Sequence, residues 1–304
     1  MNKKKARSNA MLVLTALIWG AAFVAQSVGM EYVGPLTFNA ARFLVGGIVL
    51  IPVIFLLGGN RQNHEEQTME EAKQRTKTGI IGGICCGMAL FAGGTLQQYG
   101  VSMTTVGKAG FITALYIVIV PVLGLFVKKK VAVSVWFSIA LATLGMYLLC
   151  MTGDLTISMG DALVFFCAIA FSIHILVIDH FSPKADGVLI SCVQFFTAGV
   201  LSLVGAFLFE TPEFSSLLAA WAPILYAGVL SCGVAYTMQV VAQKDTDPVI
   251  ASLILSLESV FSLLAGWVIL GQVLSSRELL GCVLVFCAII LAQIPASVFQ
   301  KKRA

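Results

Sequence analysis

Ten apolar stretches, each long enough for a helix that crosses a lipid bilayer, occupy nearly the whole chain. A helix needs about 20 apolar residues to span roughly 30 Å of hydrocarbon. Only helices and closed barrels satisfy the backbone in lipid, and continuous apolar runs without alternation of period two indicate helices. We therefore predict an all-α, polytopic membrane protein of ten transmembrane helices. The predicted spans are residues 10–28, 36–57, 79–101, 105–127, 131–150, 159–179, 186–209, 218–242, 248–270 and 275–295.

The composition excludes several classes of protein. Apolar residues make up 59% of the 304 residues and charged residues only 11%, so no sizeable soluble domain is left over. The basic clusters border membrane helices, which argues against nucleic-acid binding. No HExxH, GxSxG or Walker lysine motif is present, so we expect neither an enzyme nor an ATP-driven pump. The eight cysteines form no CxxC pair, and we expect neither a metal nor another cofactor.

The distribution of basic residues predicts how the chain sits in the membrane. With the N-terminus in the cytoplasm, sixteen of the nineteen lysines and arginines fall on the cytoplasmic side, Lys108 and Arg277 fall outside, and Arg42 lies within a helix. This asymmetry follows the positive-inside rule for an even number of spans. We expect a multi-pass protein of the inner (cell) membrane with both termini in the cytoplasm. The sixteen are Lys3, Lys4, Lys5, Arg7, Arg61, Lys73, Arg75, Lys77, Lys128, Lys129, Lys130, Lys184, Lys244, Lys301, Lys302 and Arg303.

The two halves of the chain match each other, which predicts a repeat of five helices in residues 1–152 and again in 153–304. Five is an odd number, so the second repeat is expected to insert upside down, a recurring plan of secondary transporters. The short connections predict that sequential helices pack as antiparallel neighbours. The matched pairs include Trp19 with Phe171, Arg42 with Gln194, and Tyr116 with Glu258.

Arg42 is the sharpest functional signal, because it lies about six residues inside the second predicted span. A charge in a membrane helix costs at least roughly 2.5–3.5 kcal/mol on insertion scales, so it is expected to face a cavity or a partner. Two alternatives stay open at this stage: the long side chain reaches the nearby interface, or it belongs to a structural charge pair.

Glu258 lies near the middle of the ninth predicted span and is the candidate for proton coupling. A carboxylate at this depth must be paired, hydrogen-bonded or protonated. The alternative is a carboxyl group that only stabilises helix packing. His174, on the sixth span, is either a second coupling residue or a packing histidine.

Four further residues suggest the walls of a cavity. Trp19 lies at mid-depth, away from the interfacial belt where tryptophan is common. Tyr116 occupies the position of Glu258 in the repeat, and Tyr236 and Gln239 share one face of the eighth span. Each of them alone is equally compatible with ordinary contacts between helices.

In sequence order, these residues resemble the EamA family of the drug/metabolite transporter superfamily. Two departures are visible: Ser259 stands where the family has a proline after the glutamate, and Gln272 where it has an acidic residue. The first puts a helix kink near Glu258 in doubt, and the second removes a charge. The segments that carry the resemblance are 17–20 with Phe23, 38–44, 97–100, 108–116, Val120-Pro121, 257–261 and Gly271-Gln272.

The resemblance implies a carrier with a central cavity between its halves, usually an exporter of amino acids or other small metabolites. We therefore expect a secondary-active transporter that works by alternating access and is coupled to protons, with a small molecule and the lipid bilayer as its partners. Phe23 joins Trp19, Arg42, Tyr116, Tyr236 and Gln239 as an expected substrate contact. A facilitative uptake permease and a non-transporting membrane scaffold remain alternatives, and a homodimer is left open.

Overall fold

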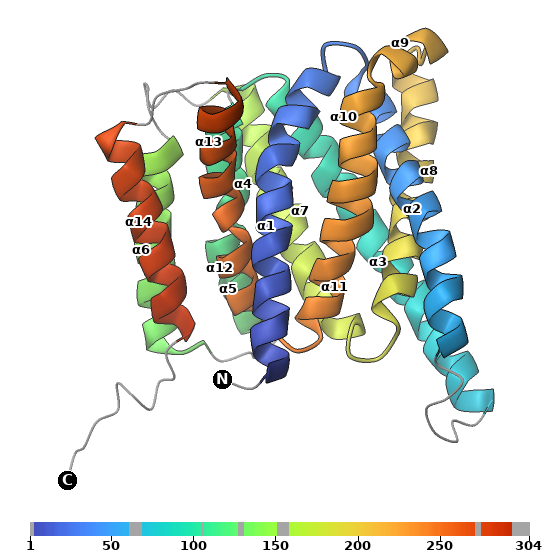
Figure 1. The fold of residues 1–304 in the computed structure, drawn as a ribbon, viewed down its shortest axis with the longest axis horizontal. Coiled ribbons are helices and arrows are strands. Elements are labelled where there is room, and N and C mark those ends of the chain that lie inside the picture. Colours follow the sequence, from blue (N-terminus) through green and yellow to red (C-terminus); the bar gives the residue numbers. More distant parts are fainter. Residues whose placement is uncertain are drawn as a thin grey trace.

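The computed structural model describes residues 3–60, 69–104, 106–126, 131–150, 158–270 and 275–293, and every regular element in these ranges is a helix. The all-α prediction is therefore confirmed for this part of the chain. The helices stand roughly parallel to one another in one bundle (Figure 1). They are α1 (Lys3–Gly29), α2 (Pro35–Asn60), α3 (Met69–Val101), α4 (Val106–Ala114), α5 (Tyr116–Phe126), α6 (Val133–Cys150), α7 (Met159–Phe181), α8 (Gly187–Phe209), α9 (Phe214–Ala219), α10 (Trp221–Leu225), η2 (Tyr226–Tyr236), α11 (Thr237–Gln243), α12 (Pro248–Leu255), α13 (Leu257–Leu270) and α14 (Ser276–Gln293).

Eight stretches of the described chain are helical, long and apolar enough to cross a membrane, and a ninth apolar helix is shorter, at Val133–Leu148. The last predicted span corresponds to α14, which packs along α6 and is not among these nine. A polytopic membrane protein is thus confirmed, whereas the number of exactly ten spans is not confirmed. The eight are Lys3–Gly29, Pro35–Leu56, Met69–Val101, Ala109–Phe126, Met159–Phe181, Gly187–Phe209, Trp221–Gln243 and Pro248–Ala265.

Two predicted spans are interrupted at equivalent places in the two halves, so the expectation of continuous helices there was wrong. The fourth span breaks at Leu115, between α4 and α5, and the ninth breaks at Ser256, between α12 and α13. At the first break the N–H of Leu115 donates to the carbonyl of Ile112 at 3.2 Å, three residues back. At the second break the N–H of Ser259 donates to the carbonyl of Ser256 at 3.2 Å, again three residues back. Such bonds are typical of the tighter 3₁₀ turn.

The eighth span is also irregular, because an eleven-residue π-helix, η2, lies between α10 and α11. π-helical segments are rare and are frequently found at functional sites. Ser231 and Tyr236, both in this π-helix, line the pocket at the centre of the bundle that is described below.

The most extensive packing joins helices from different halves of the chain, so the prediction that sequential helices pack side by side was wrong. α2 lies on α8, α3 on α7 and α8, α1 on α13, and α6 on α14. Small residues allow this close approach. A Cβ atom added to Gly83 would lie 2.5 Å from the Cβ of Val193, and one added to Gly87 would lie 2.5 Å from the Cβ of Thr197.

Replacing Gly87 with alanine should loosen the contact between α3 and α8. The new methyl group would also meet the backbone carbonyl oxygen of Gln194 at 2.8 Å, and backbone cannot rotate away as a side chain can. Overpacking of this kind costs about 1–3 kcal/mol, so we expect a lower midpoint of thermal unfolding in detergent. Gly110→Ala is the matched control, because its nearest neighbour would be the Ser259 hydroxyl oxygen at 3.9 Å. Equal midpoints for the two variants would contradict this account of the packing.

Glu210, at the end of α8, joins the two halves by capping the start of α2. Its carboxylate accepts hydrogen bonds from the N–H of Leu36 at 2.8 Å and from the N–H and hydroxyl of Thr37 at 2.9 and 2.6 Å. The first N–H groups of a helix have no partner within the helix and lie at the positive end of its dipole, so a carboxylate there is favourable. The sequence alone did not suggest this contact.

We expect Glu210→Ala to lower the free energy of unfolding by about 1–2 kcal/mol, the usual cost of losing a helix cap. The measurement is the midpoint of thermal unfolding of the purified protein. Glu213→Ala serves as the control, because Glu213 precedes α9 and makes no side-chain capping bond there. A midpoint unchanged by the Glu210 variant would show that the cap contributes nothing to stability.

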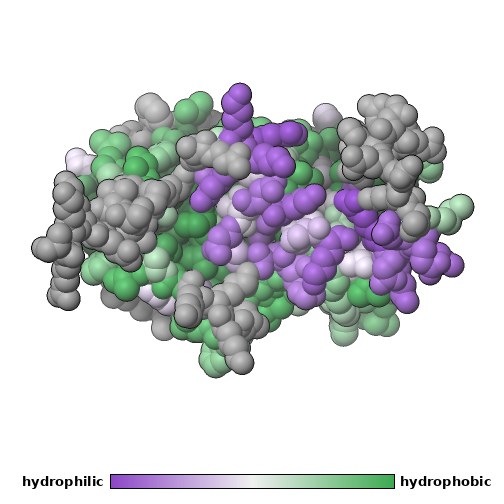
Figure 2. All heavy atoms as spheres, turned by 90° about the horizontal axis from the view of Figure 1, so that it is seen from below, coloured by the Kyte–Doolittle hydropathy of each residue, from purple (hydrophilic) through white to green (hydrophobic). Residues whose placement is uncertain are grey.

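Hydrophilic side chains gather in the middle of the lower face, the one at the bottom of Figure 1 where α1 and α3 begin (Figure 2). Lysines and arginines of the described chain expected in the cytoplasm are exposed, Arg75, Lys184 and Lys244 among them. Arg61, residues 128–130 and residues 301–303, which the same prediction included, lie outside the described residues, as does the Gly271-Gln272 pair.

Candidate functional site

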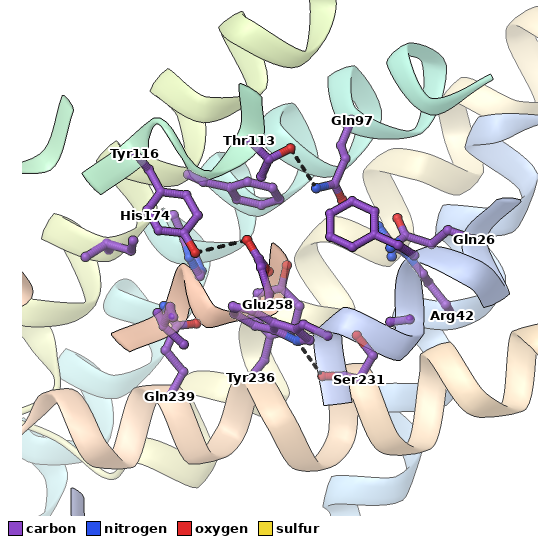
Figure 3. Close-up of a pocket in the computed structure, with 16 residues that line it drawn as sticks. Gln26, Arg42, Gln97, Thr113, Tyr116, His174, Ser231, Tyr236, Gln239 and Glu258 are labelled. Atoms are coloured by element: carbon purple, nitrogen blue, oxygen red, sulfur yellow. Dashed lines mark hydrogen bonds between the residues drawn. The ribbon is translucent and has the colours of Figure 1, made fainter. Parts of the chain in front are cut away.

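A pocket in the middle of the bundle brings together all eight residues that the sequence singled out (Figure 3). Both halves of the chain contribute to it, through α1 to α5 on one side and α7, η2 and α11 to α13 on the other. Its free volume is only about 30 Å³, so it is nearly closed. The eight are Trp19, Phe23, Arg42, Tyr116, His174, Tyr236, Gln239 and Glu258.

Arg42 lines this pocket and is only 2% exposed, so its side chain does not reach the surface of the protein. Its guanidinium carbon lies 4.8 Å from the ring centroid of Phe43 and 5.8 Å from that of Phe38. Aromatic faces attract a cation, but they accept no conventional hydrogen bond. Nε and Nη2 are buried without a hydrogen-bond partner among the described residues. A buried donor of this kind is costly unless something fills its place.

Glu258 and Tyr116 face each other across the pocket, and each follows one of the two helix breaks. The Tyr116 hydroxyl donates to Oε1 of Glu258 at 2.9 Å, and both side chains are buried. A second bond ties the two broken spans together, from the Ser259 hydroxyl to the carbonyl of Gly110 at 3.2 Å. The breaks therefore bring the equivalent residues of the two halves into direct contact.

An aromatic wall closes the pocket on the side of η2 (Figure 3). The rings of Trp19 and Tyr236 lie 4.4 Å apart between centroids, and His174 meets Tyr236 edge-on at 5.9 Å. The indole N–H of Trp19 donates to the carbonyl of Ser231 at 3.4 Å. Trp19 thus combines the two roles that were left open, because it lines the cavity and also has a partner for its N–H.

His174 is held in place by Gln194, the residue that the repeat matches to Arg42. Nε2 of the histidine lies 3.0 Å from Oε1 of the glutamine, and both side chains are buried. Nε2 of Gln194 and Oε1 of Gln239 have no partner within the described chain. Through Gln239 the pocket lining therefore keeps a hydrogen-bond acceptor that the described residues do not use.

The pocket lining also includes eight residues that were not among the sequence candidates: Ala22, Gln26, Gln97, Thr113, Phe171, Ile175, Ser231 and Leu255. Gln97 donates to the hydroxyl of Thr113 at 3.4 Å. Phe171 could have been found, because the repeat pairs it with Trp19. Ile175 and Ser231 carry no sequence signal that separates them from residues that only pack.

Comparisons with known proteins agree with this architecture. Residues 7–151 and 158–293 each match the model of the EamA-like transporter family. An uncharacterized transporter of Archaeoglobus fulgidus is 30% identical over 284 residues, which cover 93% of this chain and 84% of that protein. The uncharacterized transporter YoaV of Bacillus subtilis is 22% identical over 285 residues, which cover 91% of this chain and 94% of YoaV.

One solved structure, described only as the crystal structure of a protein, shares the fold. The superposed region covers 97% of this chain and 99% of the chain in that structure, with a TM-score of 0.78 and 16% sequence identity. At that identity the likeness concerns the fold alone.

Proposed function

Because this chain belongs to the EamA-like transporter family, we propose that it is a secondary-active carrier that exports an amino acid or another small metabolite by alternating access. The observation that carries this proposal is Arg42, a buried cation in a central pocket whose Nε and Nη2 have no hydrogen-bond partner among the described residues. A carboxylate of the carried molecule would supply the missing acceptor and neutralise the charge.

The other walls of the pocket suit the rest of such a molecule. Trp19, Phe23 and Tyr236 offer apolar and aromatic surface, and Gln239 offers an amide oxygen without a partner. The small free volume, about 30 Å³, fits a closed state, because an amino acid would enter only after the helices around the pocket move apart.

The helix breaks suit a carrier that opens alternately to the two sides. In transporters with inverted repeats, broken helices near the membrane midplane surround the substrate, and one half of the fold rocks against the other. We assign the halves to residues 1–152 and 153–304 and count α6 as the fifth span and α14 as the tenth. In this proposal the lower face and both termini lie in the cytoplasm, which is supported by the exposed basic residues and the positive-inside rule.

Glu258 is the proposed coupling residue, with His174 as a second proton-binding group. The partner that the structure gives to the carboxyl group is the neutral phenol of Tyr116. Binding a proton removes the charge of a carboxylate and with it most of the cost of enclosing the group in a dry site. Proton binding and closure of the pocket would thereby be linked.

Uptake into proteoliposomes tests this function. The purified protein is reconstituted and offered a panel of labelled amino acids and small metabolites, with and without a pH gradient. Accumulation driven by the gradient supports a proton-coupled carrier and identifies the substrate. Equilibration that ignores the gradient would instead indicate a facilitative permease, and the absence of any transport across the panel would favour a scaffold.

A further inference from the structure

A second cavity, of about 120 Å³, opens at the lower face and shares no lining residue with the central pocket. It lies where the turn between α7 and α8 meets the end of α11 and the first turns of α3. Gln239 lines the pocket, and Lys244, five residues further along the chain, lines this cavity. At 1.5 Å per helical residue the two sites are about 8 Å apart along α11.

The cavity gathers hydrogen-bond donors from three separate elements. Arg75 comes from the first turns of α3, Lys244 follows α11, and Ser182 follows α7. Ser182 is only 1% exposed, yet its hydroxyl has no hydrogen-bond partner among the described residues. Burying a hydroxyl group without a partner costs free energy, so a ligand or water is expected to satisfy it.

Asp186 is the acidic residue that lines the same cavity, and it caps the start of α8. Its Oδ1 accepts from the N–H of Val188 at 2.7 Å and from the N–H of Leu189 at 3.1 Å. The carboxylate is therefore engaged with the positive end of the helix. The three charged side chains of the lining, Arg75, Lys244 and Asp186, still leave a net charge of +1.

We propose that this cavity is an oxyanion site that takes a phosphate group, held by Arg75, Lys244 and the hydroxyl of Ser182. The cavity is lined by residues that carry a guanidinium group, an ammonium group and a hydroxyl group, a donor set that suits phosphate oxygens. The cavity lies next to the ends of three apolar segments, at Phe181, Gly187 and Gln243. The phosphate belongs either to the headgroup of an anionic lipid or to a dissolved phosphate compound.

Two probes distinguish these sources. Inorganic phosphate is titrated into the protein in a neutral detergent, and the midpoint of thermal unfolding is followed. Retention of phosphatidylglycerol against phosphatidylcholine is measured by native mass spectrometry. The test variant is Arg75→Gln with Lys244→Gln. The control is Lys73→Gln with Lys77→Gln, which removes two exposed charges of α3 that do not line the cavity.

We expect the test variant to bind at least one probe roughly fivefold more weakly for each charge removed, while the control binds as the native protein does. Ser182→Ala should weaken the same probe and leave the backbone bond from residue 182 to the carbonyl of Ile178 in place. An effect on phosphate alone indicates a dissolved ligand, and an effect on phosphatidylglycerol alone indicates a lipid. Equal binding of both probes by the test and control variants would overturn the proposal.

Discussion

Arg42→Gln should reduce transport of a carboxylate-bearing substrate by roughly tenfold to a hundredfold while leaving the protein folded. Hydrogen bonds to a charged group contribute about 1.5–3 kcal/mol each, and the variant loses at least one of them. The effect is expected because Nε and Nη2 are buried in the pocket without a partner from the described protein. The measurement is the initial rate of uptake into proteoliposomes against substrate concentration.

The same variant should be at least as stable as the native protein, which separates a binding role from a structural one. Burying a charge is a cost to the fold, and a neutral, shorter glutamine relieves it. We therefore expect an unchanged or higher midpoint of thermal unfolding together with slower transport. A lower midpoint would indicate that the contacts of Arg42 with Phe38 and Phe43 hold the fold together.

Two controls sharpen the comparison. Arg42→Lys keeps the charge but not the planar fork, so partial transport is expected. Arg277→Gln removes another arginine that lies over an aromatic ring, 5.6 Å from the centroid of Tyr147. Arg277 is exposed and does not line the pocket. Loss of transport in the Arg277 variant would mean that the effect at Arg42 is not specific to the pocket.

The sequence alone predicted the helical class and the pocket residues for one physical reason. In a chain of apolar helices, a polar or charged side chain at mid-depth has to face other protein groups. Arg42, Glu258 and His174 stood out against their neighbours, and the structure places all three in one lining. Trp19 and Tyr236 followed from their depth and from their helical face.

The helix breaks, the packing between halves and the Glu210 cap could not be predicted in this way. The hydropathy around Leu115 shows only an apolar run, which does not mark a helix break. Ser256 does not mark one either, because serine also occurs inside membrane helices. Which helices touch depends on how side chains of distant segments interlock, as Gly87 does with Thr197. Glu210 lies in a polar connection, where its sequence gives no sign of a partner some 170 residues away.

Glu258→Gln should abolish accumulation against a concentration gradient while equilibration of the substrate continues. One proton carried with each substrate molecule supports about tenfold accumulation for one pH unit, and we expect this ratio to fall to about one. Glutamine has nearly the same shape as glutamate and still accepts the hydrogen bond from Tyr116, but it cannot bind or release a proton at the carboxyl position.

The control for this loss is a carboxylate outside the pocket. Glu278→Gln removes an exposed carboxylate that accepts hydrogen bonds from Ser275 at the start of α14, and it should keep the full accumulation ratio. Tyr116→Phe adds a second test, because it removes the donor to Glu258 and keeps the titratable group. If Tyr116→Phe retains coupling and Glu258→Gln loses it, the proton is carried by the carboxyl group itself. If both variants accumulate substrate as the native protein does, Glu258 serves helix packing and the coupling group lies elsewhere.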